Sequence, residues 1–511
     1  MNFSELFNTL RHLRLRQVIY RLKYRLYKAE FCVVDAPTSK LIKFLPWVDK
    51  PKCFDGDKFD FLNISDKFHS WNCTEHGMLW AYNLNYMDWL LQGPMTEAEG
   101  AKWIDKFIAE LPQNSIGLDP YPTALRGINW IKFMSKYGGR QAWEDSLYSQ
   151  YILLTKKIEY HLLGNHLLED AYSLFIAAIY FNDKQFYKKA EKLLRQELDE
   201  QILPDGAHYE QSPMYHCILL DRLLDCCNFS FDNIRFEDQE DFNDFLCDKT
   251  ELMLGHLESI CYADGSIPLL NDSAIGIAPT IQELKNYATR LGIRWGAIEM
   301  NECGYRRLNN NKFDAIVDVG NITATYQPGH THADTFSYEL RIDGKPFIID
   351  TGISTYNKTA QRREERSTAA HNTVTIDNRN SSEVWDGFRV GKRAKVTILS
   401  DNKDEIKASH DGYGKKRLHI RHLTLSKNAF KVEDRVLQSC KAVSFIHLSP
   451  SVNIISYDNK EVITNLGNIR INNAVAVELC NCTISEQYNI LISTKVIKIN
   501  FDKNLSYIIS V

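Results

Sequence analysis

The stretch PGHTHADTFSYELRIDGKPFIIDTGISTYN, from Pro328 to Asn357, decides the fold of the second half of this 511-residue chain. Two of its parts, FSYELRIDG and PFIIDTG, are short and rich in β-branched and aromatic residues, with an Asp-Gly turn between them. Runs of the same kind follow, including NTVTID, AKVTILS, HLTLSK and YNILISTKVIKI. The pattern predicts a two-layer antiparallel β-sandwich over residues 306–511.

Residues 46–305 have a different periodicity. Apolar residues recur three and four positions apart in segments such as KWIDKFIAELP, YSQYILLTKKIEYHLLG and DAYSLFIAAIYF. Turn residues, among them Gly138-Gly139 and Pro204-Asp205-Gly206, separate these segments at intervals suited to antiparallel helix pairs. The chain is long enough for two or three domains, and this part is predicted to be a helical bundle or toroid.

Residues 1–45 form a basic segment that is predicted to be helical. Seven Arg or Lys in MNFSELFNTLRHLRLRQVIYRLKYRLYK stand against Glu5 and Glu30, with apolar residues at near-helical spacing. We interpret it as a helix packed on the helical domain, and the alternative is contact with a membrane surface or a partner. No signal peptide or membrane-spanning run is evident in the sequence, so a cytoplasmic location is expected.

The composition describes a globular protein and gives no sign of nucleic-acid binding. The formal net charge is −4, so attraction to any acidic polymer must come from local clusters of basic residues. The twelve Cys are scattered without the CxxC spacing of a zinc ribbon, and we expect most of them to be reduced and buried. The oligomeric state is not readable from the sequence.

Histidine and aspartate residues converge in the fold-deciding stretch. His330, His332 and Asp334 alternate, so they would share one face if they lie on a strand. Asp350 ends the run FIID and His371 opens the run HNTVTID, so ligands could meet from neighbouring strands. This composition suits a closed zinc site, and the alternative is a set of hydrogen-bonded side chains at strand ends.

Three further segments carry polar side chains at the ends of predicted elements. In GNHLLED, Asn165 is a candidate N-cap, and at such a helix start Asn165 or His166 could also donate to a carboxylate, with Glu169 placed to orient His166. In PDGAHYEQSPMYH, an array with Tyr209, Glu210 and Tyr215 precedes an apolar helix and is typical of a binding surface. In QRREERSTAAHNTVTIDNRNSSEVWDGFRVGKRAKV, basic residues surround an aromatic ring. Its Arg366 and Trp385 are candidates for binding carboxylates or sulfates, unless the cluster is a solvated face.

These segments together resemble the heparinase II/III-like family of polysaccharide lyases and its alginate lyase relatives. GNHLLEDAYSLF, DGAHYEQSPMYH, DGSIPLLNDSA, the stretch from Pro328 to Asn357 and RSTAAHNTVTIDNRNSSEVW follow one another in the family's order, over roughly residues 75 to 400. The HTHAD block with AHNTV is the most specific part. The resemblance implies an (α/α) toroid joined to an antiparallel β-sandwich, with an active cleft between them.

The resemblance also implies β-elimination next to a uronic acid of an acidic polysaccharide. Asn165 and His166 match the residues that neutralise the substrate carboxylate, and His330 matches the catalytic His. Tyr215 matches the catalytic Tyr, and Tyr209 is the alternative for that role. The remaining matches concern the structural zinc ion, and its ligands would be His332, Asp350 and His371.

Two other classes of function compete with this interpretation. A glycoside hydrolase on the same architecture would need paired carboxylates across the cleft, with candidates Glu169, Asp170, Asp205 and Glu210. A non-catalytic carbohydrate-binding or assembly protein could keep the fold without turnover. Secreted members of the family carry a signal peptide, so the hypothesis for this chain is an intracellular lyase linked to bacterial surface polysaccharide metabolism.

Overall fold

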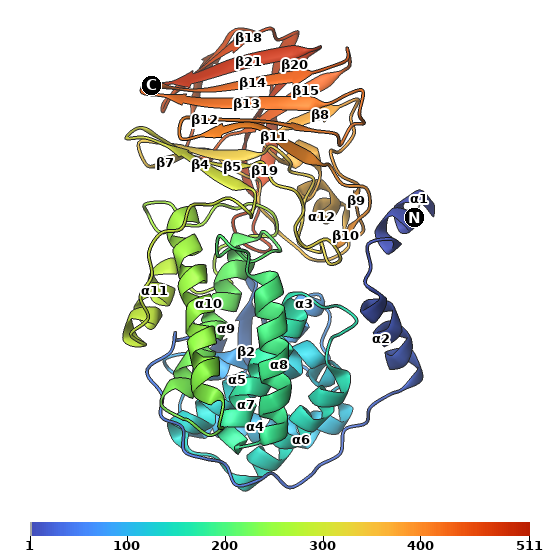
Figure 1. Cartoon of the computed structure of the whole chain (residues 1–511), viewed down its shortest axis with the longest axis vertical. Helices are drawn as coiled ribbons and strands as arrows, with labels where there is room; N and C mark the ends of the chain where they lie inside the picture. The colour runs from blue at the N-terminus through green and yellow to red at the C-terminus, as the bar shows by residue number, and fades with distance from the viewer. Residues whose placement is uncertain (1–2) are drawn as a thin grey trace.

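The computed structural model describes residues 3–511 and contains a helical part and a β-rich part arranged end to end (Figure 1). The last helix of the first part, α11, ends at Arg290, and the first strand of the second part, β4, begins at Tyr305. The predicted fold class, a helical N-terminal domain followed by an antiparallel β-sandwich, is confirmed.

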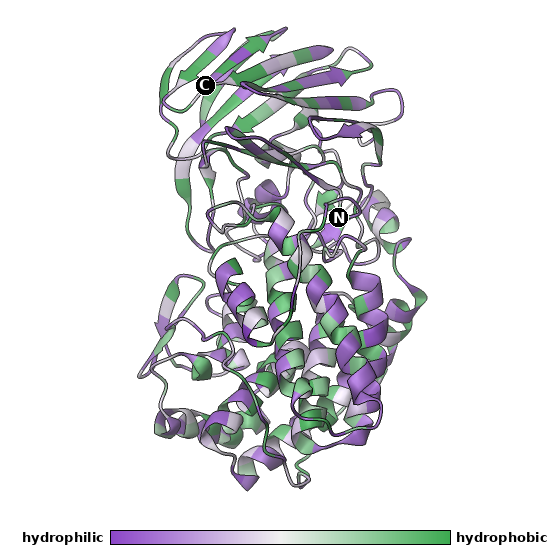
Figure 2. Ribbon diagram, turned by 60° about the vertical axis from the view of Figure 1, so that its left-hand side comes forward, coloured by the Kyte–Doolittle hydropathy of each residue, from purple (hydrophilic) through white to green (hydrophobic). Residues whose placement is uncertain are grey.

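The helical domain is built around one helix that is buried on nearly all of its surface. Helix α7 (Asn165–Phe181) is mostly apolar, with Glu169 and Asp170 as its charged residues, and every residue from Leu167 to Phe181 is buried. Its neighbour α8 (Lys184–Gln201) is amphipathic, with Leu193 and Leu194 inside and charged residues outside. Figure 2 shows this contrast, with hydrophobic segments towards the centre of the helical domain and hydrophilic residues on its outer helices. The other helices of the domain are α3 (Met78–Tyr86), α4 (Glu97–Glu110), α5 (Pro120–Tyr137), α6 (Gln141–Lys157), α9 (Pro213–Phe231), α10 (Gln239–Ile260) and α11 (Ile281–Arg290).

The β domain contains one eight-stranded sheet, two four-stranded sheets and a two-stranded ribbon of β9 (Val384–Trp385) and β10 (Arg389–Val390), all with antiparallel pairing. In its eight-stranded sheet the order is β11 (Val396–Asn402), β12 (Glu405–His410), β13 (His419–Ser426), β14 (Ala429–Val436), β21 (Asn504–Ser510), β18 (Asn468–Asn472), β17 (Glu461–Thr464) and β16 (Ile454–Tyr457). One four-stranded sheet has the order β19 (Ala476–Ile484), β20 (Ile492–Phe501), β15 (Ala442–His447) and β8 (Val374–Ile376). The other has the order β4 (Tyr305–Asn309), β5 (Phe313–Asp318), β6 (Tyr338–Ile342) and β7 (Lys345–Ile348).

One apolar core joins the three sheets. Phe313 of β5, Val432 of β14 and Ile497 of β20 are fully buried and belong to the same cluster. The burial pattern alternates strictly along β13 and β14, because successive side chains of a strand point to opposite faces. The sheets therefore pack face to face, as a sandwich requires.

The N-terminal segment crosses from one domain to the other. It forms two helices, α1 (Phe3–Leu10) and α2 (Leu15–Leu26), and then an extended stretch that runs around the outer end of the helical domain (Figure 1). Arg14 pairs with Glu200 of the helical domain, and the Thr9 hydroxyl accepts a 3.1 Å hydrogen bond from the Trp385 indole of the β domain. Of the predicted segment 1–45, residues 1 and 2 lie outside the described part.

Two expectations about the whole chain can be compared with the described residues. Among residues 3–511, no helix combines the length and apolar character needed to cross a bilayer. All twelve Cys are free, but only Cys217, Cys226, Cys227, Cys261 and Cys303 are buried. The prediction that most thiols are buried was therefore wrong, because several Cys lie on half-exposed strand and loop positions of the sandwich and of the helical domain.

Candidate active site

Tyr215 and His330 meet where the two domains join. Tyr215 lies in the first turn of α9, which begins after the N-cap Ser212, and His330 lies in the loop before β6. Their ring centroids are 3.9 Å apart with an interplanar angle of 31°. The Tyr356 hydroxyl is 3.4 Å from both the Tyr215 hydroxyl and Nδ1 of His330. The Tyr215 phenol and the His330 imidazole, which come from different domains, are thus in direct contact.

Asp272 forms a hydrogen bond with the imidazole of His330. Its Oδ2 is 2.9 Å from Nδ1 of His330, and its Oδ1 is 2.8 Å from Nε2 of His332. Arg362 of helix α12 (Ala360–Glu365) forms hydrogen bonds to both oxygens of Asp272, and both residues are fully buried. Burial alone would raise the pKa of Asp272, but Arg362, His330 and His332 together hold it well below its ordinary value. The carboxylate is therefore ionised and accepts the proton of Nδ1, which leaves the lone pair of His330 on Nε2.

Nε2 of His330 faces a second polar pair. The Asn165 side chain is 3.4 Å from it and the Glu210 carboxylate is 3.5 Å from it. Glu210 in turn accepts hydrogen bonds from the Asn165 side chain at 2.8 Å and from its backbone N–H at 3.1 Å. The N-cap of α7 is Gly164, with φ of 64°, so the prediction that Asn165 is the N-cap was wrong. A side chain at Gly164 would meet Glu210 at 2.6 Å, so only glycine fits here.

His166 lies beside Asn165 and is oriented by Glu159. Its Nδ1 is 2.9 Å from the Glu159 carboxylate, and its side chain keeps 29% of its exposure. Burial lowers the pKa of His166, but Glu159, with smaller contributions from Glu210 and Glu169, raises it by more, so the net shift is upward. Glu169, which was predicted to orient His166, lies 3.6 Å from Arg222 and has no hydrogen-bond partner of its own. That prediction was wrong because Glu169 points into the helical core, where burial raises its pKa to about 7.

Three of the predicted substrate-binding side chains have structural partners elsewhere. The Tyr209 hydroxyl is 3.0 Å from that of Tyr326, which is its hydrogen-bond partner. Arg366 is buried and donates to the carbonyl of Thr331 at 2.8 Å, which ties α12 to the His330 loop. Trp385 of strand β9 (Val384–Trp385), which pairs with β10 (Arg389–Val390), donates to Thr9 of α1 and belongs to the contact with the N-terminal helix.

The predicted metal ligands are buried together, but their arrangement differs from the expected strand face. Residues 328–337 form a loop, so the alternation of His330, His332 and Asp334 does not place them on one face. Nδ1 of His371 is 2.8 Å from the Asp350 carboxylate, and the rings of His332 and His371 have centroids 5.2 Å apart. Nδ1 of His332, Nε2 of His371 and Oδ2 of Asp334 are buried without a hydrogen-bond partner.

Unpaired nitrogen and oxygen atoms in one buried volume are costly unless a further group binds them. Two imidazole nitrogens and a carboxylate oxygen are also ligand types that zinc accepts. The unpaired atoms thus belong to His332, His371 and Asp334, whereas the oxygens of Asp350 are bonded to Nδ1 of His371 and to the backbone N–H of Gly352.

Sequence reasoning assigned no role to three residues that shape this site, Glu159, Asp272 and Tyr356, and it placed Arg362 only in the basic cluster proposed to bind carboxylates or sulfates. Each lies inside a segment that the sequence singled out or next to one. Asp272 ends the apolar run of DGSIPLLNDSA, and an acidic residue after such a run was the signal available for it.

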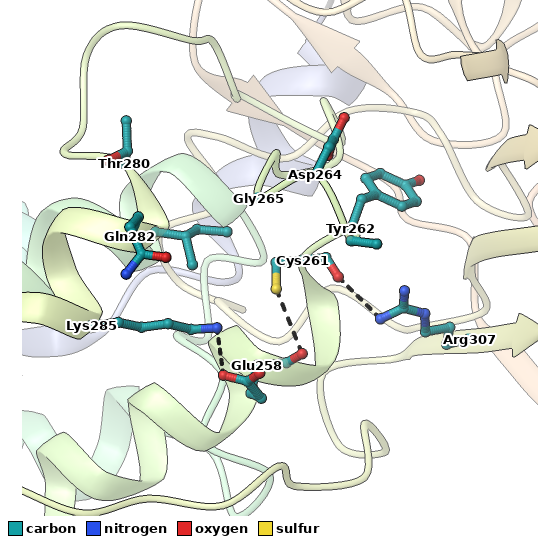
Figure 3. Close-up of a pocket in the computed structure, with 11 residues that line it drawn as sticks. Glu258, Cys261, Tyr262, Asp264, Gly265, Thr280, Gln282, Lys285 and Arg307 are labelled. Atoms are coloured by element: carbon teal, nitrogen blue, oxygen red, sulfur yellow. Dashed lines mark hydrogen bonds and ion pairs between the residues drawn. The ribbon is translucent and has the colours of Figure 1, made fainter. Parts of the chain in front are cut away.

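A separate hollow of about 600 Å³ lies on the seam between α10, α11 and β4 (Figure 3). The dashed lines in the figure mark Lys285 bound to Glu258, Arg307 bound to the carbonyl of Cys261, and the Cys261 thiol bound to the carbonyl of Glu258. Its two cations are therefore already paired. None of the predicted site residues is among those that line this hollow.

Each of the two domains matches a known protein family. Residues 143–291 match the family described as heparinase II/III N-terminus, and residues 293–487 match heparinase II/III-like, C-terminal. A heparin-sulfate lyase of Pedobacter heparinus is 24% identical over 61% of this chain and 50% of its own length. A heparin-sulfate lyase of Bacteroides stercoris is 23% identical over 43% of this chain and 37% of its own length. The matches thus span half or less of these relatives.

Solved structures share the fold. A crystal structure of heparinase III superposes with a TM-score of 0.65 at 16% identity, covering 87% of this chain and 79% of that one. A heparan sulfate lyase from Pedobacter heparinus superposes with a TM-score of 0.58 at 17% identity, covering 97% and 87%. Both cover the helical part and the β part together.

Proposed function

The chain belongs to the heparinase II/III-like family, and on that premise we propose that it is a polysaccharide lyase. Its substrate is an acidic polysaccharide containing uronic acid, and its reaction is β-elimination at the bond to C4 of the uronic acid. The observation that carries the proposal is the contact between Tyr215 and His330, with Asn165 and His166 on the adjoining helix end. A base, an acid and carboxylate-binding groups are the parts that this reaction needs.

Charge neutralisation comes first in the proposed mechanism. The C5 proton of a uronate is weakly acidic because its removal builds negative charge on the carboxylate. His166, whose pKa Glu159 raises, and the N-terminus of α7 provide positive character beside Asn165. Groups held in place before the reaction stabilise that charge without reorganising, and in many enzymes such groups contribute more to the rate than any other effect.

His330 is the base in this mechanism. Asp272 accepts the proton of Nδ1, so the lone pair of Nε2 is free and points towards Asn165. His330 removes the C5 proton, and the electron pair of the C5–H bond forms the C4–C5 double bond. The pair of the C4–O bond leaves with the oxygen.

Tyr215 is the acid. Burial raises the pKa of Tyr215, and the nearby carboxylates of Asp272 and Glu210 raise it further, so the phenol keeps its proton at neutral pH. Tyr356 donates a hydrogen bond to the Tyr215 oxygen, which leaves the Tyr215 proton available for the departing oxygen. Tyr209 is a weaker candidate for this role because its hydroxyl is bound to Tyr326.

We also propose that His332, Asp350 and His371 hold a structural zinc ion. When bound, the ion would fix the wall of the cleft behind His330. Asp272 would link the two sites, since it contacts His330 and His332 at once. In this proposal the reaction at the sugar is carried out by His330 and Tyr215, without the metal ion.

The environments of the acidic residues argue against hydrolysis. Asp170 accepts a hydrogen bond from the backbone of Glu159 at 2.8 Å, and Asp205 accepts bonds from the backbone of Asn301 and Cys303 at 2.9 Å. Glu169 is fully buried. Glycoside hydrolysis needs two carboxyl groups that flank the bond, whereas Asp170 and Asp205 are held by backbone hydrogen bonds and Glu169 is buried beside Arg222.

The test is an assay on a panel of uronic acid polysaccharides: heparan sulfate, heparin, hyaluronan, alginate and glucuronic acid-containing bacterial exopolysaccharides. Elimination creates a conjugated double bond, so the expected result is a rise in ultraviolet absorbance with at least one substrate. New reducing ends without absorbance would overturn the lyase in favour of a hydrolase. Binding to a panel member without either signal would overturn it in favour of a carbohydrate-binding protein.

A further inference from the structure

Asp205, His256 and Cys303 form a buried cluster outside the site described above. Asp205 lies in the turn after α8, His256 lies on α10, and Cys303 lies in the linker between α11 and β4. All three side chains are buried, and one potential ligand atom from each lies within 4.8 Å of the other two. Three segments far apart in sequence thus bring an oxygen, a nitrogen and a sulfur together.

The protein's own hydrogen bonds leave this cluster incomplete. Nδ1 of His256 is buried and has no hydrogen-bond partner. The adjacent His216 does not supply one, because its Nδ1 accepts from the backbone of His208 at 3.3 Å and its Nε2 is 2.9 Å from the carbonyl of Met253. A buried imidazole nitrogen without a partner costs stability, so binding of a further group at this nitrogen would be favourable.

The ionisation states of His256 and Asp205 suit a cation, whereas burial and the Asp205 carboxylate raise the pKa of the Cys303 thiol well above its ordinary value. Burial lowers the pKa of His256 to about 4, so its imidazole is neutral and can act as a ligand. Asp205 would be destabilised by burial, but the N–H groups of Asn301 and Cys303 and the other groups nearby hold its pKa below its ordinary value. It is therefore a carboxylate at neutral pH.

We propose that Asp205, His256 and Cys303 bind a Zn²⁺ ion, separate from the zinc site of the β domain. Thiolate, imidazole and carboxylate are the three ligand types that zinc prefers, and soft sulfur disfavours magnesium and calcium. Binding converts the Cys303 thiol to a thiolate and releases one proton to solvent. Water would complete the coordination.

The site would fix the angle between the domains. Cys303 lies two residues before β4, and Asp205 already accepts hydrogen bonds from the linker through Asn301 and Cys303. A metal ion would add a strong bond between the linker and α10. Since Tyr215 and His330 come from different domains, this linker determines how closely the catalytic groups meet.

Cobalt substitution tests the proposal without relying on catalysis. Co²⁺ bound to a thiolate gives a sulfur-to-metal charge-transfer band in the near ultraviolet, and the ligands His332, Asp350 and His371 include no sulfur. The metal-free full chain is titrated with Co²⁺ and then with Zn²⁺. We expect one thiolate-bound Co²⁺ per chain, displaced by Zn²⁺, in the wild type.

Matched variants identify the ligand. Cys303→Ser should lose the band, and Cys261→Ser should keep it, because Cys261 is a buried thiol of the same region that bonds only to the carbonyl of Glu258. His256→Asn should weaken Co²⁺ binding by at least ~10-fold, as loss of one strong ligand interaction does. Circular dichroism confirms that each variant is folded. A band that is absent from the wild type, or one that persists in Cys303→Ser, overturns the proposal.

Discussion

The imidazole of His330 lies against the phenol ring of Tyr215, with ring centroids 3.9 Å apart, although the two residues belong to different domains. The surroundings of the two rings make His330 the proposed base and Tyr215 the proposed acid. Asp272 keeps the lone pair of His330 on Nε2, and burial keeps the proton on Tyr215. The same contact makes the activity depend on how the helical domain and the sandwich are joined.

Replacing Tyr215 by Phe should remove the acid and leave the fold intact. We expect kcat to fall by about 10²–10⁴-fold, the usual contribution of a general acid, with KM nearly unchanged. Both kinetic constants are measured from the initial rates at which ultraviolet absorbance rises with the panel substrate that gives the largest signal. Tyr209→Phe is the matched control and should keep kcat within about threefold, because its hydroxyl bonds to Tyr326. Equal losses in both variants would contradict the assignment.

Asp272→Asn should misorient His330 and leave Arg362 buried without its anionic partner. We expect a loss of about 3–5 kcal/mol in the free energy of unfolding, together with a fall of at least ~10²-fold in kcat. Asp434→Asn is the matched control, because Asp434 is a buried carboxylate that accepts from His419 and Arg421 inside the sandwich. It should lose similar stability in denaturant unfolding but keep kcat per folded molecule. A normal kcat in Asp272→Asn would rule out a positioning role.

The Glu159–His166 pair makes a prediction about pH. The pKa of His166 is raised in the folded state, so the pair stabilises the protein fully below the unfolded His pKa of about 6.5 and loses this effect as pH rises through the folded value. Glu159→Gln should therefore cost more stability at pH near ~5.5 than at pH near ~9. Its alkaline loss of kcat/KM should begin at lower pH than in the wild type. An unchanged pH profile would show that His166 does not bind the substrate carboxylate.

Removing the zinc ion proposed for the β domain should affect the fold more than the chemistry. His371→Ala deletes one proposed ligand and unpairs Asp350, so we expect one zinc ion fewer per chain and a lower Tm. Because the ion would brace the cleft wall, KM should rise more than kcat falls. Zinc content by mass spectrometry and thermal unfolding measure it, with His447→Ala as a buried histidine control. Equal zinc content in the wild type and His371→Ala would contradict the ligand assignment.

The helices and strands predicted from the sequence agree with the structure where the pattern of neighbouring residues is enough to define an element. The helical period of DAYSLFIAAIYF and the short β runs after residue 310 are properties of neighbouring residues, and both parts of the fold follow them. The alternation of His330, His332 and Asp334 misled, because a short polar run does not distinguish a strand from a loop. Glu169 misled for a similar reason, since helical spacing says which residues share a side but not what that side faces.

The sequence by itself determined the order of the two domains, the turn chemistry between their elements and the identity of the segments that bear His330, Tyr215 and Asn165, because periodicity and residue type act over a few positions. Only the tertiary structure decided which side chains contact one another in the site. Asp272 reaches His330 across 58 positions and Arg362 across 90, and such pairings depend on packing between domains. The proton positions that support the proposed chemistry follow from those partners, because burial and nearby charge shift a pKa while residue type alone does not.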